Sequence, residues 1–206
     1  SENIYTPGDR PHVIVAMNPA AFKKNVADLR PGGVLVVNTD SFNDQNFKKV
    51  GYEKSPLDDN ALRERFRVVE IDMGTQVMRA LEGMDLSIKE VGRTKNFWAL
   101  GLLYWLYNRD TEKQLEWIKD KFKKSQLFLD ANIKAFQSGY AFGETTELFG
   151  ETYQVERATM EPGTYRNIMG NVALVTGLIT AAQKAGRPIM LGSYPITPAS
   201  DILHTL

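Results

Sequence analysis

Three short apolar runs in the first part of the chain alternate with segments whose apolar residues have helical spacing. The runs cover residues 12–17, 34–37 and 67–71. Runs this short and this apolar are typical of strands that are buried on both faces. Strands that alternate with helices favour an α/β fold, and we expect a Rossmann-like, mainly parallel sheet that is covered on both faces.

The first apolar run leads directly into a predicted helix. Asn18 is expected to cap it and Pro19 to lie in its first turn, where the missing N–H of proline costs nothing. The helix runs to about residue 29, with Phe22, Val26 and Leu29 on one face. This strand-to-helix turn lacks the Gly-x-Gly-x-x-Gly pattern, which disfavours a dinucleotide-binding site.

A block of helices follows the third apolar run. Residues 97–107 are continuously apolar or aromatic, and we predict a buried helix over residues 94–107. Asp110 or Thr111 is expected to cap a second helix, and a third ends within residues 142–147. Helical spacing places inward Leu115, Ile118 and Phe122 in the second helix, and Leu129, Ile133, Phe136 and Tyr140 in the third.

The C-terminal part of the chain is too small to bury a core of its own. Residues 150–166 are predicted to be a linker, and residues 170–185 a helix closed by Gly186. A buried strand over residues 188–192 and the start of another helix follow. One helix, one strand and a helix start need further chain to cover them. We therefore expect an α/β domain over residues 1–149, a linker over 150–166, and an incomplete second domain over 167–206.

The turn at residues 194–198 is the most informative stretch of the sequence. Thr197 can serve as the N-cap of the last helix and Pro198 as its first residue. The amides of Ala199 and Ser200 would then be free at the positive end of a helix, where an anion is favoured. The alternative is a well-formed strand-to-helix turn that binds nothing.

Composition excludes several classes of function. Twenty-five basic residues balance 25 acidic ones, so the chain has no overall field that favours nucleic acid or an anionic membrane. The absence of cysteine excludes disulfides, a cysteine nucleophile and a cysteine-ligated cluster in this chain, and two histidines argue against a histidine-rich metal site. No secretory signal and no apolar stretch of about 20 residues is visible, which predicts a cytoplasmic, non-membrane protein.

Charge is unevenly distributed along the chain. Only five of the 50 charged residues lie beyond residue 158. A segment so poor in charge is expected to be covered, either by further chain or by a partner subunit.

The Tyr-Pro-Ile-Thr-Pro sequence at residues 194–198 resembles the signature of the alpha subunit of 2-oxoacid:ferredoxin oxidoreductases. Further segments resemble that family in the same order, and the similarity looks closest to the 2-oxoglutarate type. In the fused form of the family, a gamma domain precedes the domain that holds the aminopyrimidine end of thiamine diphosphate. The matching segments are residues 12–21, 30–38, 50–57, 95–103, 142–146 and 163–171.

The resemblance implies roles for six residues. Thr197 would contact the 2-oxoacid, and Tyr194 and Ile196 would shape the wall of its pocket. On the gamma domain, the side that faces coenzyme A or the distal carboxylate of the substrate would include Asn18, Lys54 and Asn96. No catalytic residue and no metal ligand is assigned within this chain.

The resemblance also implies an alpha-beta hetero-oligomer. A beta subunit would carry thiamine diphosphate with Mg²⁺ and a [4Fe–4S] cluster, coenzyme A would be a co-substrate, and ferredoxin would accept the electrons. Two family features are missing from the chain: a Gly-rich strand and turn before residue 1, and a glutamate that pairs with the aminopyrimidine. The chain alone is therefore expected to be catalytically incomplete.

Two other classes of protein remain as alternatives. The Met-Asn-Pro sequence at residues 17–19 has a weak similarity to the Asn-Pro turn of amino-methyltransferases, although Ala20 and Ala21 stand where those enzymes use an aromatic residue. A failure of S-adenosylmethionine to shift the melting temperature would exclude that alternative. The second alternative is a non-catalytic assembly subunit, which predicts that Thr197→Ala has no effect on turnover.

Overall fold

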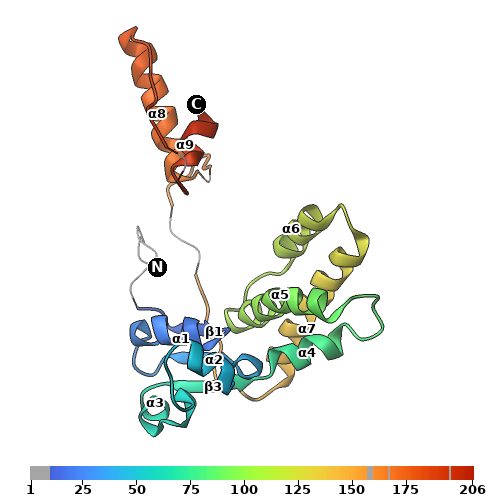
Figure 1. The fold of residues 1–206 in the computed structure, drawn as a ribbon. Helices are drawn as coiled ribbons and strands as arrows, with labels where there is room; N and C mark the ends of the chain where they lie inside the picture. The colour runs from blue at the N-terminus through green and yellow to red at the C-terminus, as the bar shows by residue number, and fades with distance from the viewer. Residues whose placement is uncertain (1–9, 157–159, 167, 195) are drawn as a thin grey trace. The chain divides into compact units, whose positions relative to one another are not determined.

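The three predicted strands form one parallel sheet in the order β1-β2-β3 (Figure 1). The strands are β1 (Val13–Ala16), β2 (Val34–Asn38) and β3 (Arg67–Ile71). Val34 of β2 lies opposite Val13 on one side and Arg67 on the other. Every residue of β2 is buried, as the continuous apolar run predicts for a central strand with both faces covered.

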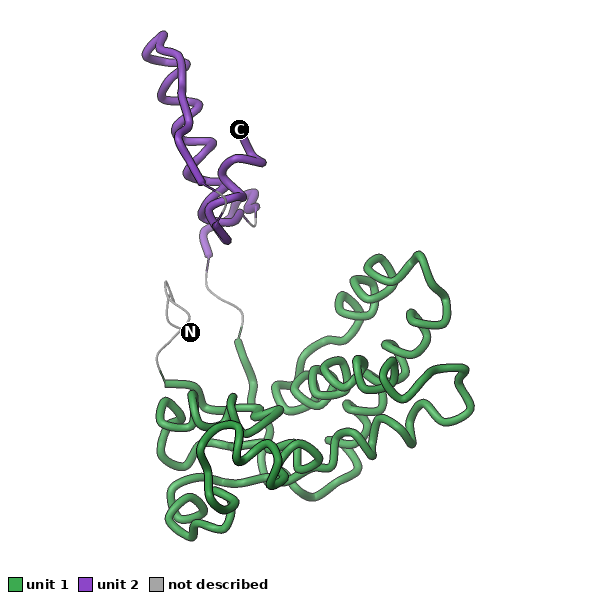
Figure 2. Tube along the Cα trace, in the orientation of Figure 1, with its two compact units in different colours: residues 1–158 green, residues 159–206 purple. Residues whose placement is uncertain are grey.

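The computed structural model describes residues 10–156, 160–166, 168–194 and 196–206. It divides into two units, residues 1–158 and residues 159–206, which Figure 2 shows in different colours. Each unit is described by itself. No helix among the described residues is both long enough and apolar enough to cross a membrane.

Helices and short turns cover the first face of the sheet. Asn18 caps α1 (Pro19–Asn25), and its Oδ1 accepts a hydrogen bond of 2.8 Å from the amide of Ala21, which confirms the predicted cap. Leu35 and Val37 of β2 pack on this face with Phe22. The remaining elements of this part are α2 (Asp44–Lys49), α3 (Asn60–Arg65) and the 3₁₀ turns Val26–Asp28, Thr39–Ser41 and Pro56–Asp58.

The helical block covers the second face, where Val34 and Val36 of β2 pack in the larger of the two hydrophobic clusters. Successive residues of β2 thus point to opposite faces, as strand geometry requires. The block comprises α4 (Met73–Ala80), α5 (Ile88–Leu106), α6 (Glu112–Phe122) and α7 (Gln126–Thr145). The predicted α/β class with a parallel sheet is therefore confirmed.

Helix α5 begins six residues earlier than the predicted start at residue 94. Ser87 forms a capping box with Glu90: each side chain bonds to the backbone amide of the other residue. These bonds satisfy two of the free amides at the helix start, so the helix extends over a polar first turn that hydropathy alone does not mark.

The inner face of α7 is formed by small residues, and the predicted inner stripe is wrong at most positions. Of that stripe only Phe136 is buried, whereas Leu129, Ile133 and Tyr140 are partly exposed. The buried positions of α7 also include Ala131, Ala135, Gly139 and Gly143. The reason is the close approach of α5 to α7.

Glycines on both helices make this approach possible. A Cβ atom on Gly101 of α5 would lie 1.9 Å from the carbonyl oxygen of Phe136, and one on Gly139 would lie 1.9 Å from that of Trp98. Large side chains would hold the two backbones apart, so the small residues face inward.

The described residues of unit 2 form two helices, α8 (Gly170–Ala185) and α9 (Ser200–Thr205). Gly186 ends α8 in the left-handed conformation, with φ of 60°, as predicted from the sequence. The strand predicted over residues 188–192 is not formed. A strand needs a neighbour to pair with, and the described residues of unit 2 contain no second strand.

Candidate functional site

The side chains predicted to contact a 2-oxoacid are exposed on unit 2. Tyr194 is 72% exposed and Ile196 is 51% exposed, and Thr197 is exposed as well. Pro195, the second residue of the motif, lies outside the described residues. Three neighbouring side chains at one turn, two of them with a hydroxyl group and one purely apolar, can form one part of a pocket wall.

Thr197 is not the cap of the last helix, which corrects the sequence-based prediction. The chain makes a turn over residues 197–199 before α9 begins at Ser200, and Ala199 occupies the N-cap position without a side-chain bond. The amide of Ser200 donates to the carbonyl oxygen of Ile196 over 3.2 Å, so it is not free for an anion. The hydroxyl of Thr197 is consequently available for a role other than capping.

Asn171 links the turn to the first turn of α8. Its Nδ2 donates a hydrogen bond of 3.1 Å to the carbonyl oxygen of Pro198. This contact joins two segments 27 residues apart and fixes the backbone next to Thr197. Asn171 is a positioning residue that sequence reasoning did not single out, because no local pattern indicates which distant carbonyl an asparagine will meet.

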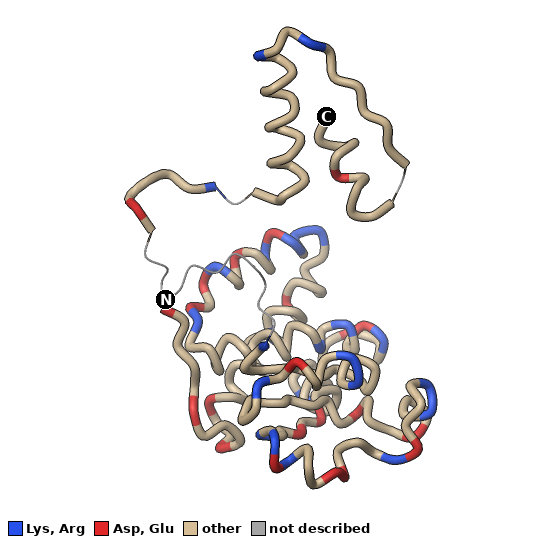
Figure 3. Tube along the Cα trace, turned by 90° about the vertical axis from the view of Figure 1, so that its left-hand side faces the viewer, with Lys and Arg blue, Asp and Glu red and all other residues tan. Residues whose placement is uncertain are grey.

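The surface of unit 2 is strongly apolar. Val175 is buried in α8, whereas Leu174, Leu178 and Met169 are about half exposed or more, and Met190 is 94% exposed. Figure 3 shows few charged residues on this part of the chain. Exposed apolar surface of this kind supports the expectation that another polypeptide segment covers it.

On unit 1, polar side chains gather at the carboxyl ends of the strands. Asn38, at the end of β2, is 1% exposed, and its Nδ2 donates to the hydroxyl of Ser41 over 3.1 Å. Asp40 accepts a hydrogen bond from the amide of Gly74 in the first turn of α4. The anion-binding position at the start of that helix is thus taken by a carboxylate of the chain itself.

Lys95 completes this group of side chains. A Cβ atom on Gly74 would lie 2.8 Å from Oδ2 of Asp40 and 3.3 Å from Nζ of Lys95, so a larger residue at position 74 would require the Asp40 side chain to move. Sequence reasoning missed Asn38 and Asp40, although their place just after a predicted strand was a usable signal.

The three residues predicted for the coenzyme A side do not meet in one cavity. Asn18 uses its Oδ1 to cap α1. Lys54 is exposed and lines a cleft of about 850 Å³ with Phe22 and Tyr52, where burial raises the pKa of the Tyr52 hydroxyl. Asn96 lines a different cavity.

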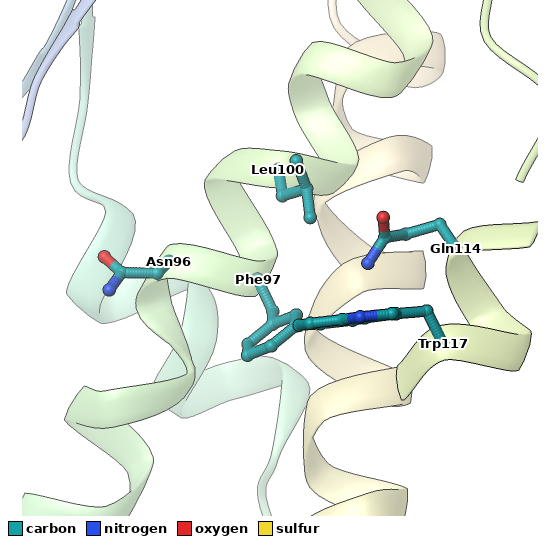
Figure 4. Close-up of a pocket in the computed structure, with 5 residues that line it drawn as sticks. All are labelled: Asn96, Phe97, Leu100, Gln114 and Trp117. Atoms are coloured by element: carbon teal, nitrogen blue, oxygen red, sulfur yellow. The ribbon is translucent and has the colours of Figure 1, made fainter. Parts of the chain in front are cut away.

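Asn96 lies in the middle of α5. The predicted helix start at residue 94 would have placed it in the first turn instead. The shift follows from the early start of α5 at the capping box. Its side chain is exposed and points away from Gln114 and Trp117 of α6 (Figure 4).

Among the residues that the structure describes, no side chains are grouped to bind an iron–sulfur cluster or a metal ion. The chain contains no cysteine, and cysteine thiolates are the usual ligands of [4Fe–4S] clusters. Within the described ranges, no three histidine, aspartate or glutamate side chains lie close enough together to hold a metal ion.

Comparison with known proteins identifies the class to which this fold and site belong. Residues 1–142 match the family model described as pyruvate ferredoxin/flavodoxin oxidoreductase. The chain belongs to this family, and the family resemblance predicted from the sequence is confirmed.

Two similar proteins narrow the comparison. The chain is 48% identical over 204 residues to the 2-oxoglutarate oxidoreductase subunit KorA of Mycobacterium tuberculosis, and the match covers 99% of this chain and 31% of that protein. It is also similar to a solved 2-oxoglutarate:ferredoxin oxidoreductase from Magnetococcus marinus with 2-oxoglutarate, coenzyme A and succinyl-CoA bound. In that comparison the identity is 27% and the TM-score 0.69, with 100% of this chain and 31% of the other covered. The chain thus spans about a third of the length of both relatives.

Proposed function

We propose that the chain is part of the alpha subunit of a 2-oxoacid:ferredoxin oxidoreductase whose substrate is 2-oxoglutarate. The observation that carries this proposal is the 48% identity to a 2-oxoglutarate oxidoreductase subunit along 99% of the chain. The alternative of an amino-methyltransferase has no support from the family, and Asn18 of its Asn-Pro turn serves as a helix cap.

The proposed reaction is an oxidative decarboxylation. A 2-oxoacid anion and coenzyme A give acyl-CoA, CO₂ and one proton, and the two electrons released pass to ferredoxin. Thiamine diphosphate with Mg²⁺, when bound, would supply the nucleophilic carbon for the keto group, and a [4Fe–4S] cluster would carry the electrons; a beta subunit would hold most of both groups. The absence of cysteine from this chain supports the assignment of the cluster to that partner.

The residues of this chain would act on the substrate from the turn before α9. The Thr197 hydroxyl would donate a hydrogen bond to a carboxylate oxygen of the 2-oxoacid, and a bond of this kind to a charged group is stronger than one between neutral groups. Tyr194 and Ile196 would form an apolar wall that excludes water. Asn171 would hold the turn in place through its bond to Pro198.

Coenzyme A or the distal carboxylate of the substrate would lie on the side of unit 1 that carries Asn18, Lys54 and Asn96. Lys54 has the properties that suit this role, because its exposed ammonium group lines a cleft with two aromatic side chains. A cation beside an aromatic wall suits a phosphate attached to a purine ring. Asn18 and Asn96 would contribute amide donors from their separate positions.

The proposed assembly is an alpha-beta hetero-oligomer in the cytoplasm, the compartment in which it would meet ferredoxin and coenzyme A. The exposed apolar side chains of unit 2 support an extensive contact with other chain.

The full-length protein purified with its partner subunit tests the proposed function. We expect reduction of ferredoxin that requires both 2-oxoglutarate and coenzyme A, with kcat/KM for 2-oxoglutarate at least about tenfold above that for pyruvate. Absence of turnover with 2-oxoglutarate would reject the substrate. Full turnover by the partner without this chain would favour the non-catalytic assembly subunit.

A further inference from the structure

Helices α5 and α6 of unit 1 enclose an aromatic groove, and of its lining residues only Asn96, whose side chain points away from Gln114 and Trp117, has a place in the proposed reaction. One part, of about 360 Å³, is lined by Phe97 and Leu100 of α5 and by Trp117 and Gln114 of α6. Figure 4 shows the side chains of α6 extending toward α5 across this space. A second part of about 220 Å³ adjoins it, shares Phe97, and adds Phe122 and Phe128.

Contacts between the helices define the shape of the groove. The Tyr104 hydroxyl donates a hydrogen bond of 3.0 Å to Oε1 of Gln114, which ties α5 to α6 at one end. Ring centroids of Phe97 and Trp117 are 6.4 Å apart and those of Phe97 and Phe122 are 5.6 Å apart. Trp117 nevertheless remains 49% exposed. A tryptophan left half exposed over an apolar floor is typical of a surface that a partner covers.

Cationic side chains border the groove. Lys113 and Lys121 lie one helical turn before and after Trp117 on the same stripe of α6, and Nζ of Lys121 is 4.5 Å from the centre of the Trp117 ring. Arg93 lines the second part of the groove from α5. The carboxylate that lines the groove, Glu90, is engaged by Ser87 in the capping box.

The acidic residues of α6 occupy a stripe of that helix next to the one that carries Lys113, Trp117 and Lys121. They are Glu112, Glu116 and Asp120, and Asp120 pairs with Lys123 over 2.9 Å. The groove therefore combines an aromatic floor with a positively charged border, a combination that complements an acidic amphipathic helix.

We propose that this groove docks an acidic amphipathic helix from another polypeptide. Apolar side chains from successive turns of that helix would fill the two adjoining cavities, with one packed against Phe97 and Trp117. Its carboxylates would face Arg93, Lys113 and Lys121. This inference concerns an interaction surface and stands independently of the proposed reaction.

Photo-cross-linking in the host cell tests the proposal on the full-length protein. The probe is p-benzoylphenylalanine placed at position 117, with cross-linked peptides identified by mass spectrometry. We expect a cross-link to another polypeptide, in a segment whose apolar residues have helical spacing and are flanked by Asp or Glu. The double variant Lys113→Glu/Lys121→Glu should lower its yield at least about fivefold, as should raising the salt concentration of a lysate.

Lys134→Glu provides the matched control, because Lys134 is exposed on α7 and does not line the groove. It should leave the yield unchanged. A cross-link only to this polypeptide or to a second copy of it would overturn the proposal, as would a partner segment without the acidic pattern. The same holds for no cross-link at all, or for a yield that charge reversal does not change.

Discussion

At the scale of single residues, the contact between α5 and α7 depends on the absence of a methyl group. Gly101 and Gly92 lie in the same helix, but a Cβ atom meets backbone at 1.9 Å on Gly101 and nothing within 4 Å on Gly92. Gly101→Ala should lower the free energy of unfolding of unit 1 by about 3 kcal/mol through overpacking. Gly92→Ala should raise it by about 0.5–1 kcal/mol, because alanine favours the helix.

Urea unfolding followed by tryptophan fluorescence measures both variants, since all three tryptophans lie in unit 1. Equal effects of the two substitutions would show that the backbones of α5 and α7 are not in contact.

The capping box of α5 makes a second prediction at this scale. Hydrogen bonds from the side chain and backbone of Ser87 lower the pKa of the Glu90 carboxyl. A folded pKa below the unfolded one stabilises the protein above about pH 4.3, the usual pKa of glutamate, and this stabilisation is lost as pH falls through the folded pKa. Ser87→Ala should cost about 1 kcal/mol at pH 7 and should make the loss of stability on acidification shallower.

Ser125→Ala is the matched control for that variant. Ser125 occupies the N-cap of α7 but makes no capping hydrogen bond, so its replacement should change stability by less than about 0.5 kcal/mol. The free energy of unfolding of both variants should be measured between pH 3 and pH 7. This range extends about one unit or more on each side of the glutamate pKa. A Ser87 variant with the pH profile of the parent would contradict the role of the box.

At the scale of elements, the sequence was most informative for the strands of the sheet. The run over residues 67–71 matches β3 at both ends, because a short apolar run in an α/β pattern has few other solutions. The prediction for the inner face of α7 was wrong because large residues point to the core only where the facing helix leaves room for them. Here Gly101 and Gly139 bring the backbones together, and one sequence cannot reveal which glycines will meet.

The strand prediction in unit 2 was wrong because strand formation depends on residues that are distant in the sequence. The apolar run over residues 188–192 finds no partner strand in the described part of unit 2, so its strand propensity has no effect. The early start of α5 was predictable, since Ser87 and Glu90 have the spacing of a capping box. At the candidate site, the grouping of residues 194, 196 and 197 could be predicted from the motif. The hydrogen bond from Asn171 to the carbonyl oxygen of Pro198 could not.

Asn171 gives the prediction that belongs to this scale. Asn171→Asp in the assembled enzyme keeps the size of the side chain but replaces the donor to Pro198 by a second acceptor. Loss of about 1 kcal/mol of positioning should raise KM for 2-oxoglutarate about fivefold, with a smaller change in kcat. Thr180→Ala on the same helix, where the hydroxyl bonds only along the helix, should leave both constants unchanged. An unchanged KM in the Asn171 variant would remove it from the site.

At the scale of the whole molecule, the two units differ in how much of their apolar surface they bury. Both hydrophobic clusters lie within unit 1, whereas unit 2 exposes many large apolar side chains. A chain shortened to residues 1–158 should therefore unfold in urea within about 0.5 kcal/mol of the full 206-residue chain. Binding of a hydrophobic fluorescent dye should fall markedly on the same truncation. Loss of cooperative unfolding would show that unit 1 needs unit 2 to fold.

The proposed function requires the Thr197 hydroxyl to lie in the substrate site of the assembled 2-oxoglutarate oxidoreductase. The most direct test is kcat/KM of the assembled full-length enzyme for 2-oxoglutarate with Thr197→Ala, compared with Thr180→Ala. Loss of a hydrogen bond to a charged carboxylate should cost about 1.5–3 kcal/mol, so kcat/KM should fall about 10- to 150-fold in the Thr197 variant alone. Equal kcat/KM in the parent and the Thr197 variant would contradict the claim and favour a non-catalytic role for this part of the chain.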